Sequence, residues 1–211
     1  MTIGYNRFLT RCLEDKMKPK ENKGYNVGTY DECQTPPYAL EPLMPYIKEW
    51  KILIWECAAG KRVLANSMRD DWGFNVLSTD INDPVGYGDF FEIEPENKNY
   101  IIVTNPPYSI KYEWVERCYE LGKPFALLLP IEMLGSAKGR RLFGKPGHGI
   151  EIIFMTPRVD FYMPNMGYKG GGAQFPTAWF TWKLNLPQQL NFTALNKPGH
   201  RDLPEYWEKC L

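Results

Sequence analysis

Short apolar runs alternate with amphipathic segments along most of the chain, and no other feature of the sequence constrains the fold as strongly. The runs have the length of β-strands and are apolar on both faces, which is typical of strands buried in a parallel sheet. Between them, residues 62–72 and 109–123 place apolar side chains at helical spacing, and a basic helical segment runs to about Phe143. The apolar runs are residues 51–55, 74–80, 100–105, 124–130, 150–155 and 177–184.

This alternation predicts an α/β fold with a mostly parallel sheet and helices on both of its faces. The last two runs are separated by a glycine-rich loop (165–174) instead of a helix, so we expect them to form an antiparallel hairpin at one edge. The 211 residues suffice for one domain with a full core. We expect a flexible N-terminal arm (1–30), the α/β domain itself (31–186) and a C-terminal extension packing on the same domain (187–211).

The composition favours a cytoplasmic protein without a metal centre. No apolar run approaches the roughly 20 residues that span a membrane, and the N-terminus lacks the apolar core of a signal peptide. The cysteines number 5 and include no C-x-x-C pair, while the 2 histidines, His148 and His200, have no further metal ligand beside them. We therefore expect no membrane segment, no disulfide framework and no metal.

Charge gives two opposing indications about a nucleic-acid partner. The chain carries 25 basic and 25 acidic residues, and nucleic-acid enzymes are usually more basic than this. Residues 138–148, in contrast, contain Lys138, Arg140, Arg141, Lys145 and His148 without any acid. The cluster is either a solvated helix end or a phosphate-binding surface.

Polar or small residues follow the first three predicted strands, where open α/β sheets bind their ligands. The first of these segments is Glu56-Cys57-Ala58-Ala59-Gly60, in which small residues let the backbone approach a ligand. Asp80 ends the next strand, where it could hold both ribose hydroxyls or simply cap a helix. Asp89-Phe90 lies in the loop beyond it. Their shared position at the strand ends favours a cofactor site.

The most specific motif is Asn105-Pro106-Pro107-Tyr108, directly after the third strand. The two prolines fix the backbone and offer carbonyl acceptors without N–H donors. Together with the Asn105 amide, such an acceptor can engage both hydrogens of an exocyclic amino group and leave its nitrogen lone pair available for a methyl group. Tyr108 offers a ring on which a planar base can stack, worth roughly 1–3 kcal/mol. A proline-rich turn at a strand end is the structural alternative.

On these motifs the chain resembles S-adenosylmethionine-dependent amino-methyltransferases of the Asn-Pro-Pro-Tyr class, and most of all the small phage-type DNA adenine-N6 methyltransferases. The likeness runs from about Tyr30 to Lys183. It implies a Rossmann-like methyltransferase fold with a sheet of the seven-stranded type. It also implies transfer of a methyl group from S-adenosylmethionine to adenine in DNA, with S-adenosylhomocysteine as the product and the base flipped into the cleft.

The resemblance also implies roles for individual residues. Asn105, Pro106, Pro107 and Tyr108 would be catalytic. The expected cofactor contacts are Thr35, Pro36, Pro37, Glu56, Cys57, Ala58, Gly60, Asp80, Ile81, Asp89, Phe90 and Asn105. The expected substrate contacts are Tyr108, Lys138, Arg140, Arg141, Lys169, Phe175 and Trp179.

The sequence departs from that family in two respects. Arg62 stands where the family has a second glycine in the cofactor loop, and no segment is long enough for a separate target-recognition domain. Sequence specificity would then come from residues 138–148, the 165–174 loop and the N-terminal arm. Three alternatives stay open: adenine methylation in RNA, methylation of a glutamine side-chain amide in a protein, and a cofactor-binding phage protein without transferase activity.

Overall fold

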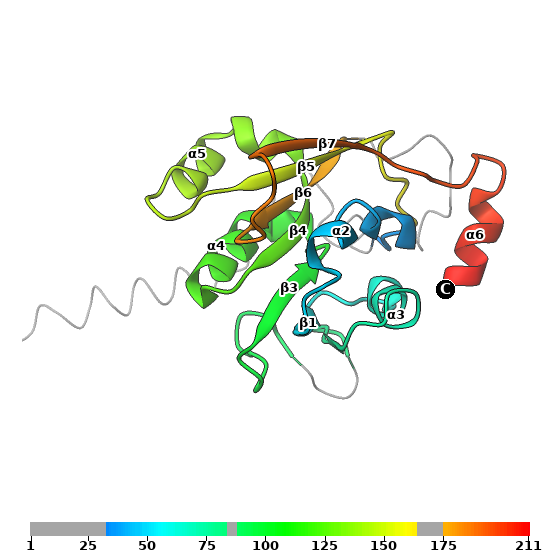
Figure 1. Ribbon diagram of the computed structural model, residues 1–211, viewed down its shortest axis with the longest axis horizontal. Coiled ribbons are helices and arrows are strands. Elements are labelled where there is room, and N and C mark those ends of the chain that lie inside the picture. The colour runs from blue at the N-terminus through cyan, green and yellow to red at the C-terminus, as the bar shows by residue number, and fades with distance from the viewer. Residues whose placement is uncertain (1–32, 84–87, 164–174) are drawn as a thin grey trace, which may run out of the picture.

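The computed structural model describes residues 33–83, 88–163 and 175–211, which form a seven-stranded sheet with helices packed against it (Figure 1). The strand order is β2-β1-β3-β4-β6-β5-β7. The strands are β1 (Leu53–Glu56), β2 (Val76–Ser78), β3 (Tyr100–Thr104), β4 (Phe125–Pro130), β5 (Glu151–Thr156), β6 (Thr177–Trp182) and β7 (Leu190–Ala194). The predicted α/β class with a mixed, mainly parallel sheet is confirmed.

The half of the sheet that carries the candidate site is parallel. Strand β1 pairs with β2 on one side and with β3 on the other, and β3 pairs with β4, all in parallel. Every residue of β3 and β4 is buried, as the apolar runs predicted. Because the strands are parallel, the loops that follow β1, β2 and β3 meet at one edge of the sheet.

The other half contains the predicted antiparallel pair, but this pair does not end the sheet. Strand β6 lies between β4 and β5 and runs antiparallel to both. Strand β7 then pairs in parallel with the outer side of β5 and forms the edge. The sequence pattern did not predict β7, because its residues alternate between exposed and half-buried positions and include no continuous apolar run.

Helices cover both faces of the sheet, and alternate residues of each strand serve the two cores. One core lies under η1 (Pro37–Leu40), α2 (Met44–Ile47), α3 (Val63–Asp70) and α6 (Leu203–Cys210). The other lies under η2 (Tyr108–Ile110), α4 (Lys111–Leu121), η3 (Ile131–Gly135) and α5 (Ala137–Phe143). Ile102 and Phe180 belong to the second core, whereas their strand neighbours Val103 and Trp179 belong to the first.

The boundaries of α4 agree only in part with the sequence prediction. The helix ends at Gly122, whose φ of 68° lies in the left-handed region that glycine adopts without strain. Its start differs, because Ser109 belongs to the 3₁₀ turn η2 and Ile110 occupies the N-cap position. The tetrapeptide therefore leads into a tight turn before the helix begins.

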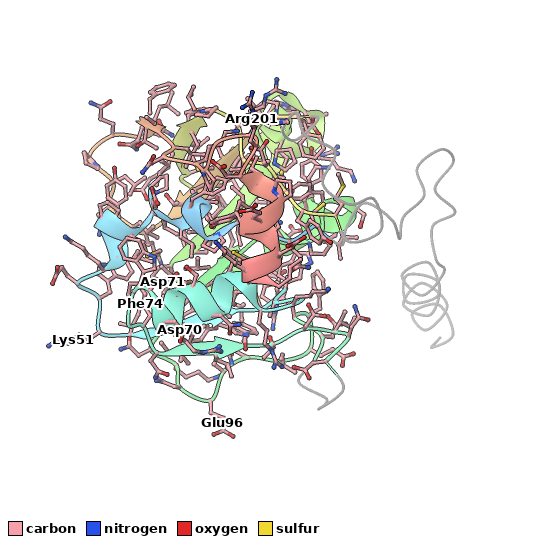
Figure 2. The ribbon with its side chains drawn as sticks, turned by 90° about the vertical axis from the view of Figure 1, so that its right-hand side faces the viewer. Lys51, Asp70, Asp71, Phe74, Glu96 and Arg201 are labelled. Atoms are coloured by element: carbon pink, nitrogen blue, oxygen red, sulfur yellow. The ribbon has the colours of Figure 1, made fainter. Side chains whose placement is uncertain are left out.

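Residues 187–211 add the edge strand β7 to the sheet and then close over the first core as α6. Leu203 and Trp207 are buried, and the Trp207 ring lies 5.3 Å from that of Tyr162. Figure 2 shows α6 in front, next to α3, while Lys51 and Glu96, which precede β1 and β3, project at the margin of the molecule. In the part of the chain that the structure describes, no helix has the length and apolar character of a membrane span. The predicted N-terminal arm lies outside the described residues.

Candidate active site at the carboxyl ends of the parallel strands

A cavity of about 770 Å³ opens where the loops after β1, β2 and β3 meet. Its size falls in the range of small-molecule and cofactor sites. Loop residues from Glu56 to Arg62 form one side, Asp80 to Asp83 another, and Asp89 to Phe91 a third. The remaining walls come from Cys33, Gln34, Thr35, Asn105, Pro107, Ile110 and Trp114, together with Val63 and Leu64 of α3.

The loop after β1 is held in place by its neighbour after β2. The Ala59 amide donates to the Thr79 carbonyl oxygen (3.0 Å), and the Gly60 amide donates to the Asp80 carboxylate (2.8 Å). Gly60 has a φ of 47°, and a side chain there would meet the Gln34 amide at 3.0 Å. Glycine adopts this φ without strain, and a larger residue would also have to push the Gln34 side chain aside. Arg62, at the family's second glycine position, has a φ of 64° and forms an ion pair with Asp83.

Glu56 places a buried carboxyl group in the wall of the cavity. Its Oε1 accepts a hydrogen bond from the Thr104 hydroxyl (2.6 Å), whereas Oε2 has no hydrogen-bond partner among the described residues. Burial raises the pKa of Glu56 to about 8, against the lowering effect of the hydrogen bonds from Thr104 and the Ala58 backbone. The unpartnered oxygen can accept a hydrogen bond from a ligand, and a cationic donor would favour the charged form.

Asp80 shapes the loops as well as lining the cavity. One carboxylate oxygen accepts from the Gly60 amide and the other accepts from the Asn82 amide (2.9 Å). The side chain thus caps a turn after β2 and not a helix, which was the structural alternative. Ile81 beside it is 69% exposed although it is apolar and lines the cavity. Such an exposed apolar surface suits a planar ring of a ligand.

Aromatic residues build the wall around Asp89 and Phe90. Asp89 accepts a hydrogen bond from the Phe91 amide (2.9 Å), which closes a tight turn. The buried Phe90 ring stacks on Trp114 with centroids 4.0 Å apart. Phe91 is half exposed and also faces the cavity, as does Ile110. Sequence reasoning missed Phe91, Ile110 and Trp114; the adjacent Phe90-Phe91 pair was the one signal for the first of these.

The tetrapeptide after β3 combines an unpartnered acceptor with a rigid backbone. Asn105 and Pro107 line the cavity, and Pro106 is buried beneath them. The Asn105 Oδ1 atom is buried and has no hydrogen-bond partner among the described residues. Because a buried acceptor without a partner costs about 1–3 kcal/mol, its position in a cavity wall indicates a ligand that donates to it.

Tyr108 lies against two phenylalanine rings from distant parts of the chain. The Phe175 centroid is 5.7 Å away and the Phe161 centroid 6.5 Å away, both in edge-to-face geometry. Phe175 was expected beside the substrate, and it does lie next to Tyr108. Phe161 was not predicted, because it comes from the loop after β5 and no local pattern marks it.

The segment 158–162, which carries Phe161, is tied to three other regions. Asp160 is buried, forms an ion pair with Lys197 (2.6 Å), and its backbone amide donates to the Tyr38 hydroxyl (2.9 Å). Tyr162 exchanges two backbone hydrogen bonds with Gln34, at 2.7 and 3.0 Å. Gln34 in turn lines the cavity and accepts from the Lys61 amide (3.3 Å). Tyr108, Phe161 and Phe175 do not line the cavity themselves, and this segment connects their ring cluster with the cavity wall formed by the loop after β1.

Several predicted contacts do not line the cavity. Thr35 does, but Pro36 and Pro37 turn away from it to begin η1. The prediction for Trp179 is wrong: its ring is fully buried in the first core, and its indole N–H donates to the Ala39 carbonyl oxygen (2.7 Å). Adjacent strand residues face opposite sides of a sheet, and Trp179 points to the face under α2. Lys169 lies outside the described residues.

The residues of the predicted basic cluster, which lie in and after α5, have different surroundings. Lys138, Arg140 and Arg141 are all exposed, and the Lys138 ammonium lies over the Tyr112 ring. Lys145 is paired with Glu116 (2.8 Å), and the His148 ring stacks on Tyr119 at 3.9 Å. None of these five side chains lines the cavity.

Comparison with known proteins finds likeness of fold. No protein-family model matches the chain, and no curated protein matches its sequence. The methyltransferase subunit of a type I restriction-modification system from Streptococcus thermophilus superposes with a TM-score of 0.53 at 17% identity, over 84% of this chain. The chain spans only 53% of that subunit. A proposed RNA methyltransferase from Pyrococcus horikoshii superposes with a TM-score of 0.50 at 15% identity, over 85% of this chain and 97% of its own.

These structures share the sheet and helix arrangement described above, so the chain has the Rossmann-like methyltransferase fold. Identities of 15–17% are too low to transfer an activity or a substrate.

Proposed function

We propose that this protein transfers a methyl group from S-adenosylmethionine to the exocyclic N6 amino group of adenine in DNA. The observation that carries the proposal is the buried Oδ1 of Asn105 in the wall of the cavity, which has no hydrogen-bond partner in the described part of the chain. The methyltransferase fold and the type I restriction-modification neighbour support the same reaction class. The roles of individual residues and the DNA partner are part of the proposal.

The residues around the cavity fit S-adenosylmethionine. Asp80 would hold the ribose hydroxyls, Ile81 and Phe90 would cover the adenine ring, and Asp89 would accept from its amino group. Glu56, with an unpartnered Oε2, would accept from the ammonium group of the methionine part. Gly60 and the Ala58 backbone leave room for the ligand to approach. When bound, S-adenosylmethionine supplies an electrophilic methyl group and leaves as S-adenosylhomocysteine.

Asn105 would act on the nitrogen that attacks. Its carbonyl oxygen would accept one hydrogen of the amino group, and the backbone carbonyl of Pro106 would accept the other, while that of Pro107 already accepts from the Ile110 amide (3.4 Å). As a bond forms from nitrogen to the methyl carbon and the bond from that carbon to sulfur breaks, positive charge develops on the nitrogen. Acceptors already in place stabilise that charge, and the nitrogen then releases a proton to solvent.

Tyr108 would bind the base before the reaction. An adenine inside a duplex must be flipped out, which costs a few kcal/mol. Stacking on the Tyr108 ring offsets part of that cost. Phe161 and Phe175 hold the ring edge-on, so its orientation is set by the fold and not by the substrate.

The proposal is tested by incubating the protein with radiolabelled S-adenosylmethionine and DNA, RNA or protein acceptors in separate reactions, followed by nucleoside analysis. We expect N6-methyladenine in the DNA sample. Asn105→Ala should lower turnover by orders of magnitude with nearly unchanged cofactor affinity, and Asn105→Asp should retain part of the activity. Asn191→Ala, in the edge strand β7, is the matched control and should behave like the parent.

RNA is the second candidate acceptor, because the Pyrococcus horikoshii neighbour with nearly full mutual coverage is a proposed RNA methyltransferase. Label in adenine of the RNA sample alone would replace DNA by RNA as the substrate. Label in neither nucleic acid, or near-normal turnover of Asn105→Ala, would contradict the proposed function.

A further inference from the structure

Two lysine side chains share one aromatic ring beside the tetrapeptide. The Lys111 ammonium lies 5.4 Å from the centroid of the Tyr112 ring, and the Lys138 ammonium lies 5.3 Å from the same centroid. Lys111 begins α4, and Lys138 lies in the first turn of α5 (Figure 1). Both contacts have the geometry of cation–π interactions, which fix the place of a long side chain.

Hydrogen bonds fix this arrangement next to Tyr108. Lys111 donates from its ammonium to the Tyr108 carbonyl oxygen (3.1 Å). The Tyr112 hydroxyl is hydrogen-bonded to the Ser136 hydroxyl (2.7 Å), and Ser136 is the N-cap of α5. Ile110, which precedes Lys111, lines the cavity. The two charges are therefore held at the rim of the candidate site.

The charges of Lys111 and Lys138 are not neutralised within the described residues. Neither forms an ion pair there, although Lys98, Lys145 and Lys197 each pair with a carboxylate. Glu113 and Glu132 are the acids nearest to them in the sequence; both are exposed, and neither pairs with either lysine. Because each ammonium group lies within 5.4 Å of the same ring centroid, both add to the positive potential at this rim. Two like charges near one ring favour binding of an anion.

We propose that Lys111 and Lys138 bind the phosphate backbone of the nucleic acid beside the target base. This inference rests on the proposed function, which makes a nucleic acid the substrate, and it assigns the phosphate contact to specific residues. Lys111 was not recognised from the sequence, because it lies outside the basic cluster 138–148. Of that cluster, Lys138 alone has a cation–π contact with Tyr112 among the described residues, and Lys145 is already paired.

The test is a salt titration of nucleic-acid binding. Fluorescence anisotropy with a labelled adenine-containing duplex is measured across a range of salt concentrations for the parent, Lys111→Gln, Lys138→Gln and the double variant. Glutamine keeps most of the side-chain length and a donor for the Tyr108 carbonyl, while it removes the charge. Each phosphate contact contributes close to one to the slope of log affinity against log salt, so each variant should flatten the slope by up to about 1.

Controls separate a phosphate site from general charge and from damage to the fold. Lys145→Gln removes the same charge from an ion-paired lysine and should leave the slope nearly unchanged. Lys111→Arg and Lys138→Arg keep the charge and should restore binding. Cofactor affinity, measured by calorimetry, should be the same in all variants. A parallel titration with RNA of the same sequence shows which nucleic acid the site prefers.

The inference is wrong if the double variant keeps the parental slope, if Lys145→Gln loses as much as Lys138→Gln, or if the parent binds neither DNA nor RNA. Failure of the proposed function is read separately, from methyl transfer. A protein that binds nucleic acid through these lysines without transferring a methyl group would support the phosphate site and contradict the proposed reaction.

Discussion

Replacing Glu56 by glutamine should make the stability of the protein less dependent on pH. In the unfolded chain this carboxyl group has a pKa of 4.5, and burial raises the pKa to about 8 in the folded protein. Between these two values the unfolded state loses its proton while the folded state keeps it. Stability contributed by the group is therefore fully present below pH 4.5, falls as pH rises, and is lost above about pH 8.

The magnitude follows from the size of the pKa difference. One pKa unit corresponds to about 1.4 kcal/mol, so the full effect is on the order of 3 to 5 kcal/mol. Glutamine stays neutral at every pH, so the Glu56→Gln variant should not lose this stability as pH rises. The thiols of Cys57 and Cys118 also have raised pKa values because of burial, but they are present in both proteins and titrate above the window.

Urea denaturation at pH values from 5 to 9 measures the effect. The stability of Glu56→Gln relative to the parent should increase by several kcal/mol across this range. Glu132→Gln, at an exposed position, should follow the parent. A constant difference between Glu56→Gln and the parent from pH 5 to 9 would refute the reasoning.

S-adenosylmethionine binding at pH 7 should also release a fraction of a proton from Glu56, which calorimetry in two buffers of different ionisation enthalpy detects.

Lys197 and Tyr108 each give one further prediction, tested with a pair of variants. Lys197→Met should lower the free energy of unfolding by about 3 kcal/mol in thermal or urea denaturation, because it leaves the buried Asp160 carboxylate without its partner. The control Lys145→Met breaks an exposed ion pair and should cost under about 1 kcal/mol. Equal losses in the two variants would contradict the expected difference between a buried and an exposed pair. Tyr108→Ala should raise KM for the nucleic acid more than it lowers kcat. Tyr108→Phe should change both constants only slightly, because the ring face does the stacking. Equal impairment of the two variants in steady-state kinetics would contradict this prediction.

The sequence predicted the parallel half of the sheet because its strands are apolar on both faces. Tyr100–Thr104 and Phe125–Pro130 are buried throughout, which leaves few alternatives to a central strand. Strand β7 escaped prediction because an edge strand with exposed Phe192 has no comparable pattern. At the site, the residues that follow strands directly, such as Asp80 and Asn105, could be placed from the topology alone.

Contacts between distant segments could not be placed in this way. Phe161 reaches Tyr108 through tertiary packing, and the Tyr112 ring gathers Lys111 and Lys138 from two helices. Trp179 was assigned to the substrate from the family resemblance, although the alternation of side chains along β6 directs it into the core. Motif and strand position together identify a loop, whereas the direction of each side chain depends on register.

The segment 158–162 limits how this site can change during evolution or engineering. Phe161 touches Tyr108, and one residue later Tyr162 forms two backbone hydrogen bonds with Gln34, whose side chain borders the loop after β1. Enlarging the proposed acceptor side by moving Phe161 would therefore also displace a wall of the proposed cofactor cavity. Homologues that accept a different substrate should change residues 34–38 together with residues 158–162, and libraries aimed at new acceptors should vary both segments at once.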